Sequence, residues 1–70
     1  MTWEEDFISE NDEIRLCGDD GRPLGVIDKL EGSPRWRIRR MRDGKLSSIG
    51  FSENKASAMF ALTEAVRMTS

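Results

Sequence analysis

Apolar and polar residues alternate along the middle of the chain, and this pattern predicts a series of short β-strands. Strands are expected at residues 14–17, 24–30, 35–42 and 45–51. Turn residues rich in Gly, Pro and Asp separate them, and the Asp43-Gly44 pair is a strong signal for a two-residue hairpin. Because the connections are short, the strands are expected to pair in antiparallel order.

The end of the chain predicts a helix that covers one face of this sheet. Ser52 is a suitable N-cap, and Glu53 follows in the favourable first turn. The predicted sheet-facing side carries Ala56, Met59, Phe60, Leu62, Thr63 and Val66, and the opposite side carries Ala58, Ala61 and Ala65. The expected fold is therefore α+β, a three- to four-stranded antiparallel sheet packed on one C-terminal helix, with its other face open.

The first twelve residues follow neither pattern and mix acids with Trp3, Phe7 and Ile8. Trp3 and Phe7 are four residues apart, so one turn of helix would place them on the same face. Residues 1–12 are therefore interpreted as an acidic N-terminal arm or short helix. Residues 13–70 are expected to form a single β-β-β-β-α domain, since 70 residues leave room for one domain only.

The composition argues against an enzyme. The chain contains no His and a single Cys, Cys17, so the usual zinc sites and the Ser-His-Asp and Cys-His catalytic arrangements are excluded. No catalytic residue, metal site or cofactor is expected. The start lacks the features of a signal peptide, and the apolar runs are too short to span a membrane. The expectation is a cytoplasmic protein without catalysis.

Charge is distributed unevenly along the chain. The total of 11 Lys and Arg against 13 Asp and Glu gives a formal net charge of −2. Residues 1–20 hold eight acids and one base, whereas residues 21–52 hold eight bases and three acids. Six of those eight bases are Arg, whose planar fork suits phosphates and guanine edges. The near-neutral total thus combines an acidic start with a basic middle.

The segment RWRIRRMR at residues 35–42 concentrates this positive charge. Its apolar residues alternate with Arg until Met41, which falls out of phase. A β-bulge near Arg39 and Arg40 would restore the alternation. With that bulge, Trp36, Ile38 and Met41 face inward, as do Ile49 and Phe51 of the next strand. Arg35, Arg37, Arg42 and at least one of Arg39 and Arg40 then face the open side.

An arginine-rich ribbon of this kind fits the major groove of DNA, and its phosphate contacts would weaken with salt. The candidate DNA-binding residues are Arg35, Arg37, Arg39, Arg40, Arg42 and Lys45. The alternative interpretation is a solvated strand face whose arginines pair with the acidic arm or with Asp19 and Asp20.

Three short motifs carry a family resemblance: Trp36-Arg37-Ile38-Arg39, Asp43-Gly44-Lys45 and Ile49-Gly50-Phe51, with the helix start at residues 52–56 after them. Through these, residues 25–67 resemble the arm-type DNA-binding domain of phage tyrosine-recombinase integrases and, more loosely, the plant ethylene-response DNA-binding domain. The resemblance implies three antiparallel strands and one helix. It also implies that the open sheet face enters the major groove, with Arg35, Arg37 and Arg39 touching bases or phosphates.

Two functions follow as hypotheses. The first is a small phage or mobile-element module that contacts duplex DNA with the arginine-rich face. The second is a small acidic phage inhibitor, anti-CRISPR-like or otherwise anti-defence, that binds a host nucleic-acid-binding protein by imitating phosphates. Its candidate partner-binding residues are Glu4, Glu5, Asp6, Glu10, Asp12 and Glu13. A homodimer is a further possibility, because an edge strand and an apolar helix face both invite pairing.

Overall fold

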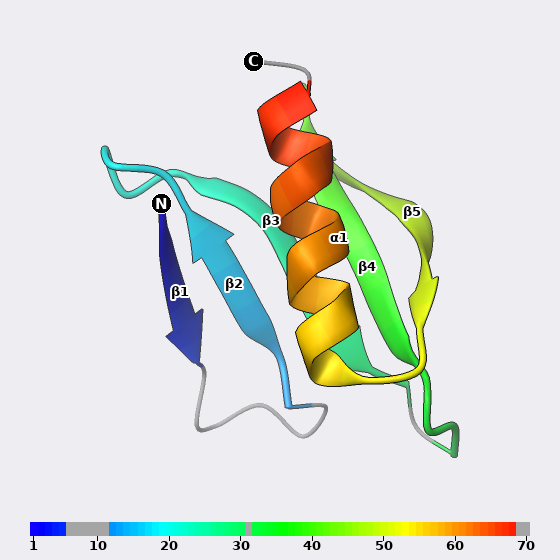
Figure 1. Ribbon diagram of the computed structural model, residues 1–70. Coiled ribbons are helices and arrows are strands. Elements are labelled where there is room, and N and C mark those ends of the chain that lie inside the picture. The colour runs from blue at the N-terminus through cyan, green and yellow to red at the C-terminus, as the bar shows by residue number, and fades with distance from the viewer. Residues whose placement is uncertain (6–11, 31, 69–70) are drawn as a thin grey trace.

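A computed structural model describes residues 1–5, 12–30 and 32–68 of the chain. The strands are β1 (Thr2–Glu5), β2 (Ile14–Cys17), β3 (Pro23–Lys29), β4 (Trp36–Arg42) and β5 (Lys45–Ser52), and the helix is α1 (Lys55–Met68). All five strands form one antiparallel sheet in the order β1-β2-β3-β4-β5, with α1 lying across β3 and β4 on one face (Figure 1). The α+β class and the C-terminal helix are confirmed, but the sheet has five strands instead of three or four.

The additional strand comes from the acidic start of the chain. Thr2–Glu5 pairs with β2, with Trp3 opposite Leu16, and Trp3 packs against the hydrophobic core. These residues are extended, not helical, because pairing with β2 satisfies their backbone polar groups while Trp3 loses water. Residues 6–11 of the expected arm, Phe7 and Ile8 among them, lie outside the described residues.

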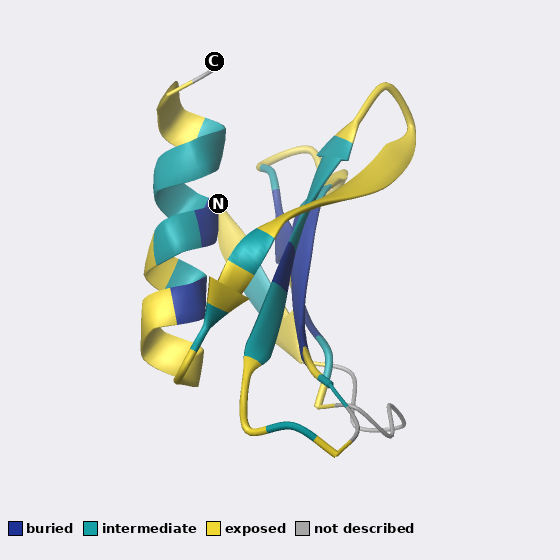
Figure 2. Cartoon of the chain, turned by 90° about the vertical axis from the view of Figure 1, so that its right-hand side faces the viewer, coloured by how far each residue is buried: buried dark blue, intermediate teal, exposed yellow. Residues whose placement is uncertain are grey.

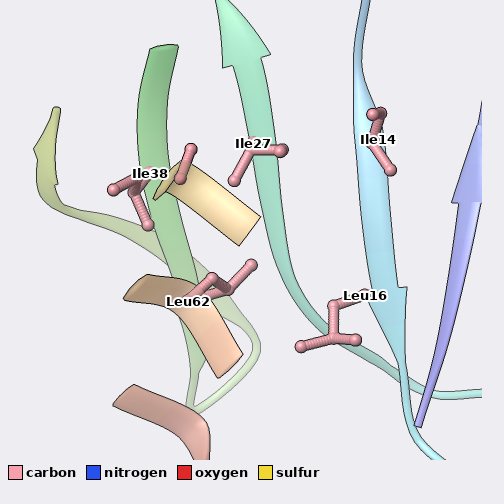
Figure 3. Packing of buried hydrophobic residues seen from close by; sticks show 6 residues of the cluster. Ile14, Leu16, Ile27, Ile38 and Leu62 are labelled. Carbon is pink, nitrogen blue, oxygen red and sulfur yellow. The ribbon is translucent and has the colours of Figure 1, made fainter. Parts of the chain in front are cut away.

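The core lies between α1 and the middle strands of the sheet, as Figure 3 shows. It contains Ile14, Leu16, Ile27, Ile38, Ala58 and Leu62. The strand residues of this set sit at alternate positions, so they share the face toward the helix. Burial of each large side chain stabilises the fold by about 1.5–3 kcal/mol. This burial is what holds the helix on the sheet.

The side of the helix that faces the sheet is predicted in part: Leu62 is in the core and Met59 and Val66 pack against it, but other positions differ. Ala58 and Leu62 are fully buried, whereas Phe60, expected to face inward, is 69% exposed. Ala61 packs against the core instead of facing outward. Small side chains at the contact let the helix approach the sheet closely, and Leu62 then reaches the strand backbone at Gly25. Close packing of the helix backbone against the sheet therefore stabilises the fold more than burial of the larger Phe60 side chain would.

Asn54, not Ser52, caps the helix. Its Oδ1 accepts a hydrogen bond of 2.8 Å from the backbone N–H of Ser57, three residues later, as an N-cap side chain does. Ser52 is instead the last residue of β5, paired with Trp36. The helix begins at Lys55 because pairing with β4 keeps the chain extended through Ser52.

The irregularity expected in the arginine-rich strand lies in its neighbour. Ile38 pairs with Gly50 and Arg39 pairs with Ser48, so Ile49 is the extra residue of a bulge in β5. Gly50 has φ 155°, a conformation that glycine adopts far more readily than other residues. The prediction of a bulge near Arg39 and Arg40 of β4 is wrong, because the extra residue belongs to the strand paired with them.

This position of the bulge changes which side chains face inward. Since β4 alternates without interruption, Met41 follows Arg37 and Arg39 onto the face opposite the helix. Ile49 and Phe51, expected to be inward, are 47% and 53% exposed. The inward orientation of Trp36 and Ile38 is confirmed, since both belong to or pack against the core.

Close contact between the helix and β3 predicts that Gly25→Ala destabilises the fold. A Cβ at this position would lie 2.6 Å from Leu62 Cδ1 and 2.8 Å from the carbonyl oxygen of Arg39. We expect the free energy of unfolding, measured by urea denaturation, to fall by about 1–3 kcal/mol. Gly18→Ala is the matched control, since the nearest atom there is a side-chain oxygen of exposed Asp20 at 3.2 Å. Equal losses in the two variants would contradict the packing argument.

Candidate nucleic-acid interface

The sheet face opposite α1, called the open face below, carries a mixture of charged and apolar residues. Figure 2 shows α1 along one side of the sheet, and none of the described helices or strands covers the other side. The register places Arg15 opposite Val26, Val26 opposite Arg39, and Asp28 opposite Arg37 on this face. The open face therefore brings two of the predicted arginines next to a carboxylate of β3.

Asp28 is the centre of this arrangement. Arg37 donates hydrogen bonds from Nε and Nη2 to the two carboxylate oxygens, at 3.1 and 2.6 Å. Arg39 donates from Nη2 to Oδ2 at 3.4 Å. A bidentate pair between Arg and a carboxylate is stronger and more directional than a neutral hydrogen bond. One buried carboxylate thus holds two guanidinium groups in place on the open face.

The three side chains differ in their exposure to water. The Asp28 side chain is 5% exposed, whereas those of Arg37 and Arg39 are 31% and 24% exposed. The hydrogen bonds with Asp28 raise the pKa of Arg37 above its ordinary value, although burial alone would lower it. Asp28, Arg37 and Arg39 together carry two positive charges against one negative. Glu13 is near enough to Arg37 to contribute to its raised pKa, and β1 places Glu4 opposite exposed Arg15 on the same face.

The other four predicted DNA-binding residues lie elsewhere. Arg40 pairs with Gly25 on the helix side of the sheet and is half-buried. Arg42 and Lys45 pair with each other at the exposed hairpin end of β4 and β5. Arg35 precedes β4 and is exposed. The prediction that Arg42 shares the open face with Arg37 is wrong, because it assumed the bulge in β4.

The acids that balance the arginines do not come from the expected places. Asp19 binds the N-terminal amine at 3.1 Å, and Asp20 pairs with Arg22 at 3.4 Å. The carboxylate that binds the arginines belongs to the adjacent strand β3. Asp28 therefore balances Arg37 and Arg39, while Glu4 of the acidic arm lies opposite Arg15 in the register of β1 and β2.

The acids predicted to imitate phosphates are spread over different surfaces. Glu4 and Glu5 are consecutive in β1 and so point to opposite faces. Glu5 pairs with Lys55 at 3.2 Å, and Glu4 accepts a hydrogen bond of 3.7 Å from the Cys17 thiol. The remaining members are exposed Asp12, half-buried Glu13, and Asp6 and Glu10, which lie outside the described residues.

Two residues of the open face, Asp28 and Arg15, were missed in the sequence. The signal for Asp28 was an acid inside an otherwise apolar strand, which alternation places on the same face as Val26. Such an acid needs a cation on the neighbouring strand, and the β3–β4 hairpin supplies Arg37. The signal for Arg15 was its alternation with Ile14 and Leu16 in β2.

The described residues offer no obvious site for a metal ion. No group of three or more His, Cys, Asp or Glu side chains gathers among them. Nor does any helix within these ranges have the length and apolar character needed to cross a membrane. The arrangement on the open face is instead suited to binding an anion through guanidinium groups.

Removal of the Asp28 charge is expected to destabilise the protein. In Asp28→Asn the two half-buried arginines lose their counter-charge, and the amide nitrogen cannot accept their hydrogen bonds. We expect a loss of about 2–3 kcal/mol in the free energy of unfolding, from urea denaturation. Asp43→Asn is the control, because it changes the net charge equally at an exposed turn whose φ of 51° Asn also tolerates. Similar stability of the two variants would show that the pairing contributes little.

The buried thiol of Cys17 predicts how the stability of the protein depends on pH. Burial raises the pKa of its thiol above 9.0, and the nearby Glu4 carboxylate raises it further. The folded state therefore favours the protonated thiol, so stability is present at neutral pH and falls as the pH rises above 9.0. We expect urea denaturation to show this fall, and Cys17→Ala to reduce it. An unchanged pH dependence in the variant would mean that other groups cause it.

Comparisons of this chain with protein-family models, with curated proteins and with solved structures give no match. The resemblance of residues 25–67 to the arm-type integrase domain therefore stays a prediction. The functional argument that follows depends on the geometry of the open face.

Proposed function

We propose that this chain is a DNA-binding module that contacts duplex DNA with the open face of β3, β4 and β5. The observation that carries the proposal is the pair of arginines held on this face by Asp28. Arg37 uses Nε and Nη2 for this contact, which leaves Nη1 to donate to a phosphate or a guanine edge. An anchored side chain also loses less conformational entropy when it binds.

The width of the sheet decides which strands enter the groove. Neighbouring strands lie about 4.8 Å apart, so three strands span about 10 Å between their axes and five span about 19 Å. The major groove is about 12 Å wide. Three neighbouring strands therefore fit, and β3, β4 and β5 are the proposed set because β4 at their centre carries Arg37 and Arg39; β1 and β2 then lie over the phosphate backbone. In that position exposed Arg15 faces a phosphate strand.

Further phosphate contacts come from the ends of the ribbon. Arg35 lies at the start of β4, and Arg42 and Lys45 lie at the hairpin that joins β4 and β5. All three are exposed. Phosphate contacts position a protein on DNA without reading sequence, whereas Arg37 and Arg39 are placed to meet base edges. The integrase resemblance implies contact of Arg35, Arg37 and Arg39 with bases or phosphates, without dividing them between the two.

The proposal is tested by titrating the full chain with a fluorescently labelled DNA duplex at several NaCl concentrations. We expect affinity to fall steeply with salt. In the double variant Arg15→Gln/Arg39→Gln, loss of the Arg15 phosphate contact reduces the slope of log affinity against log salt by about 0.9, and loss of the Arg39 base contact weakens binding at every salt concentration. The bidentate Arg37–Asp28 pair remains in this variant, so the buried carboxylate keeps its main partner.

The matched control is Arg22→Gln/Arg67→Gln. It removes the same charge from exposed pairs with Asp20 and Glu64, which lie on a turn and on the helix. Equal losses in both double variants would show a general charge effect, and a parent chain without DNA affinity would overturn the proposal. That second outcome would favour the phosphate-imitating inhibitor, which ranks lower because its described acids are dispersed.

A further inference from the structure

The outer side of β5 is an open sheet edge. β5 is the last strand in the sheet order, has eight residues, and pairs on its other side with β4. An edge strand presents unpaired N–H and C=O groups that can bind another strand. The opposite edge, β1, has only four residues, and two of them are the acids Glu4 and Glu5. Figure 2 shows most of β5 in the colour of exposed residues.

The side chains of β5 do not protect this edge. Native edge strands usually carry charges or proline that block pairing. From Leu46 to Ser52 the strand has neither, and its only charged residue is Lys45 at the start. Leu46, Ile49 and Phe51 are all exposed, although each is a large apolar residue. An exposed apolar edge of this length is a typical place for a partner strand.

We propose that two copies of this chain pair through β5, antiparallel about a two-fold axis, and so join two five-stranded sheets into one. A two-fold interface is reciprocal: if one residue contacts a second residue of the partner, then that second residue contacts the first residue of the partner, so each contact occurs twice. With Leu46 opposite the partner's Phe51, Phe51 is opposite the partner's Leu46. Both side chains lie on the open face, because β4 places Met41 and Arg37 opposite them. Two equivalent apolar pairs form.

The charges at the ends of β5 are complementary in the same register. Lys45 lies opposite the partner's Ser52, next to the partner's Glu53, and this contact also occurs twice. No like charges meet along the strand, since residues 46–52 are uncharged. This self-complementarity identifies a second copy as the occupant, whereas an unrelated strand would need no such reciprocity. The interface includes the β5 edge of the proposed DNA-binding face, but the argument for it does not depend on that function.

The test is sedimentation velocity of the full chain without DNA, over protein concentrations from about 1 to about 300 µM, the range of weak association. We expect a concentration-dependent dimer. Ile49→Lys weakens it at least about tenfold, because residue 49 lies next to the two-fold axis and brings two like charges together. Phe60→Lys, the matched control on the exposed side of α1, is expected to leave the dimer unchanged.

A mixture of Ile49→Lys and Ile49→Glu chains provides the decisive measurement. Opposite charges then face each other across the axis, so we expect a heterodimer where Ile49→Lys alone is monomeric. A parent chain that is monomeric throughout the range overturns the proposal. So does a dimer that survives Ile49→Lys, or one that Phe60→Lys abolishes. Because DNA is absent from these measurements, their outcome is separate from that of the DNA titration.

Discussion

The alignment of β3 and β4 depends on the buried carboxylate of Asp28 and the arginines that bind it. A charge that is taken out of water needs a partner, and leaving it unpaired costs several kcal/mol. Only one register of β3 against β4 places Asp28 directly opposite Arg37 while also placing Ile27 opposite Ile38 in the core. A shift by one residue would move every side chain of β4 to the other face. The ion pair and the core therefore specify the same alignment.

The bulge in β5 connects this alignment to the surface of the molecule. Because the extra residue is Ile49, β4 stays regular and keeps Arg37 and Arg39 together beside Asp28. The unfavourable consequence is in β5, where the apolar side chains of Ile49 and Phe51 remain exposed to water. Exposure of these residues is the reason that the edge invites a partner strand. One local irregularity thus shapes both the arginine face and the exposed edge.

The proposed DNA-binding face and the proposed dimer edge use different groups of the same part of the sheet. Side chains of β4 project from the sheet toward a groove, whereas the backbone of β5 offers hydrogen bonds within the plane of the sheet. A two-fold pair through β5 would place two arginine faces on one continuous sheet.

The alternation of apolar and polar residues was enough to predict the β2 to β5 strands, their antiparallel order and the C-terminal helix. It works because strand periodicity is local and each buried position repeats every second residue. Trp36 and Ile38 were placed inward for this reason. The arginines at positions 37 and 39 were recognised as candidates from their alternation with apolar residues and from the integrase resemblance, without their partner.

Tertiary structure decided what local periodicity leaves open. The bulge could lie in either of two paired strands, and only the pairing of Gly50 with Ile38 placed it in β5. The face of the helix was decided by the close fit of Leu62 against Gly25, which favours small Ala58 over large Phe60. The role of Asp28 depended on the strand across from it. In each case the deciding contact joins residues of two different elements, and a pattern read along one segment contains no information about the element that packs against it.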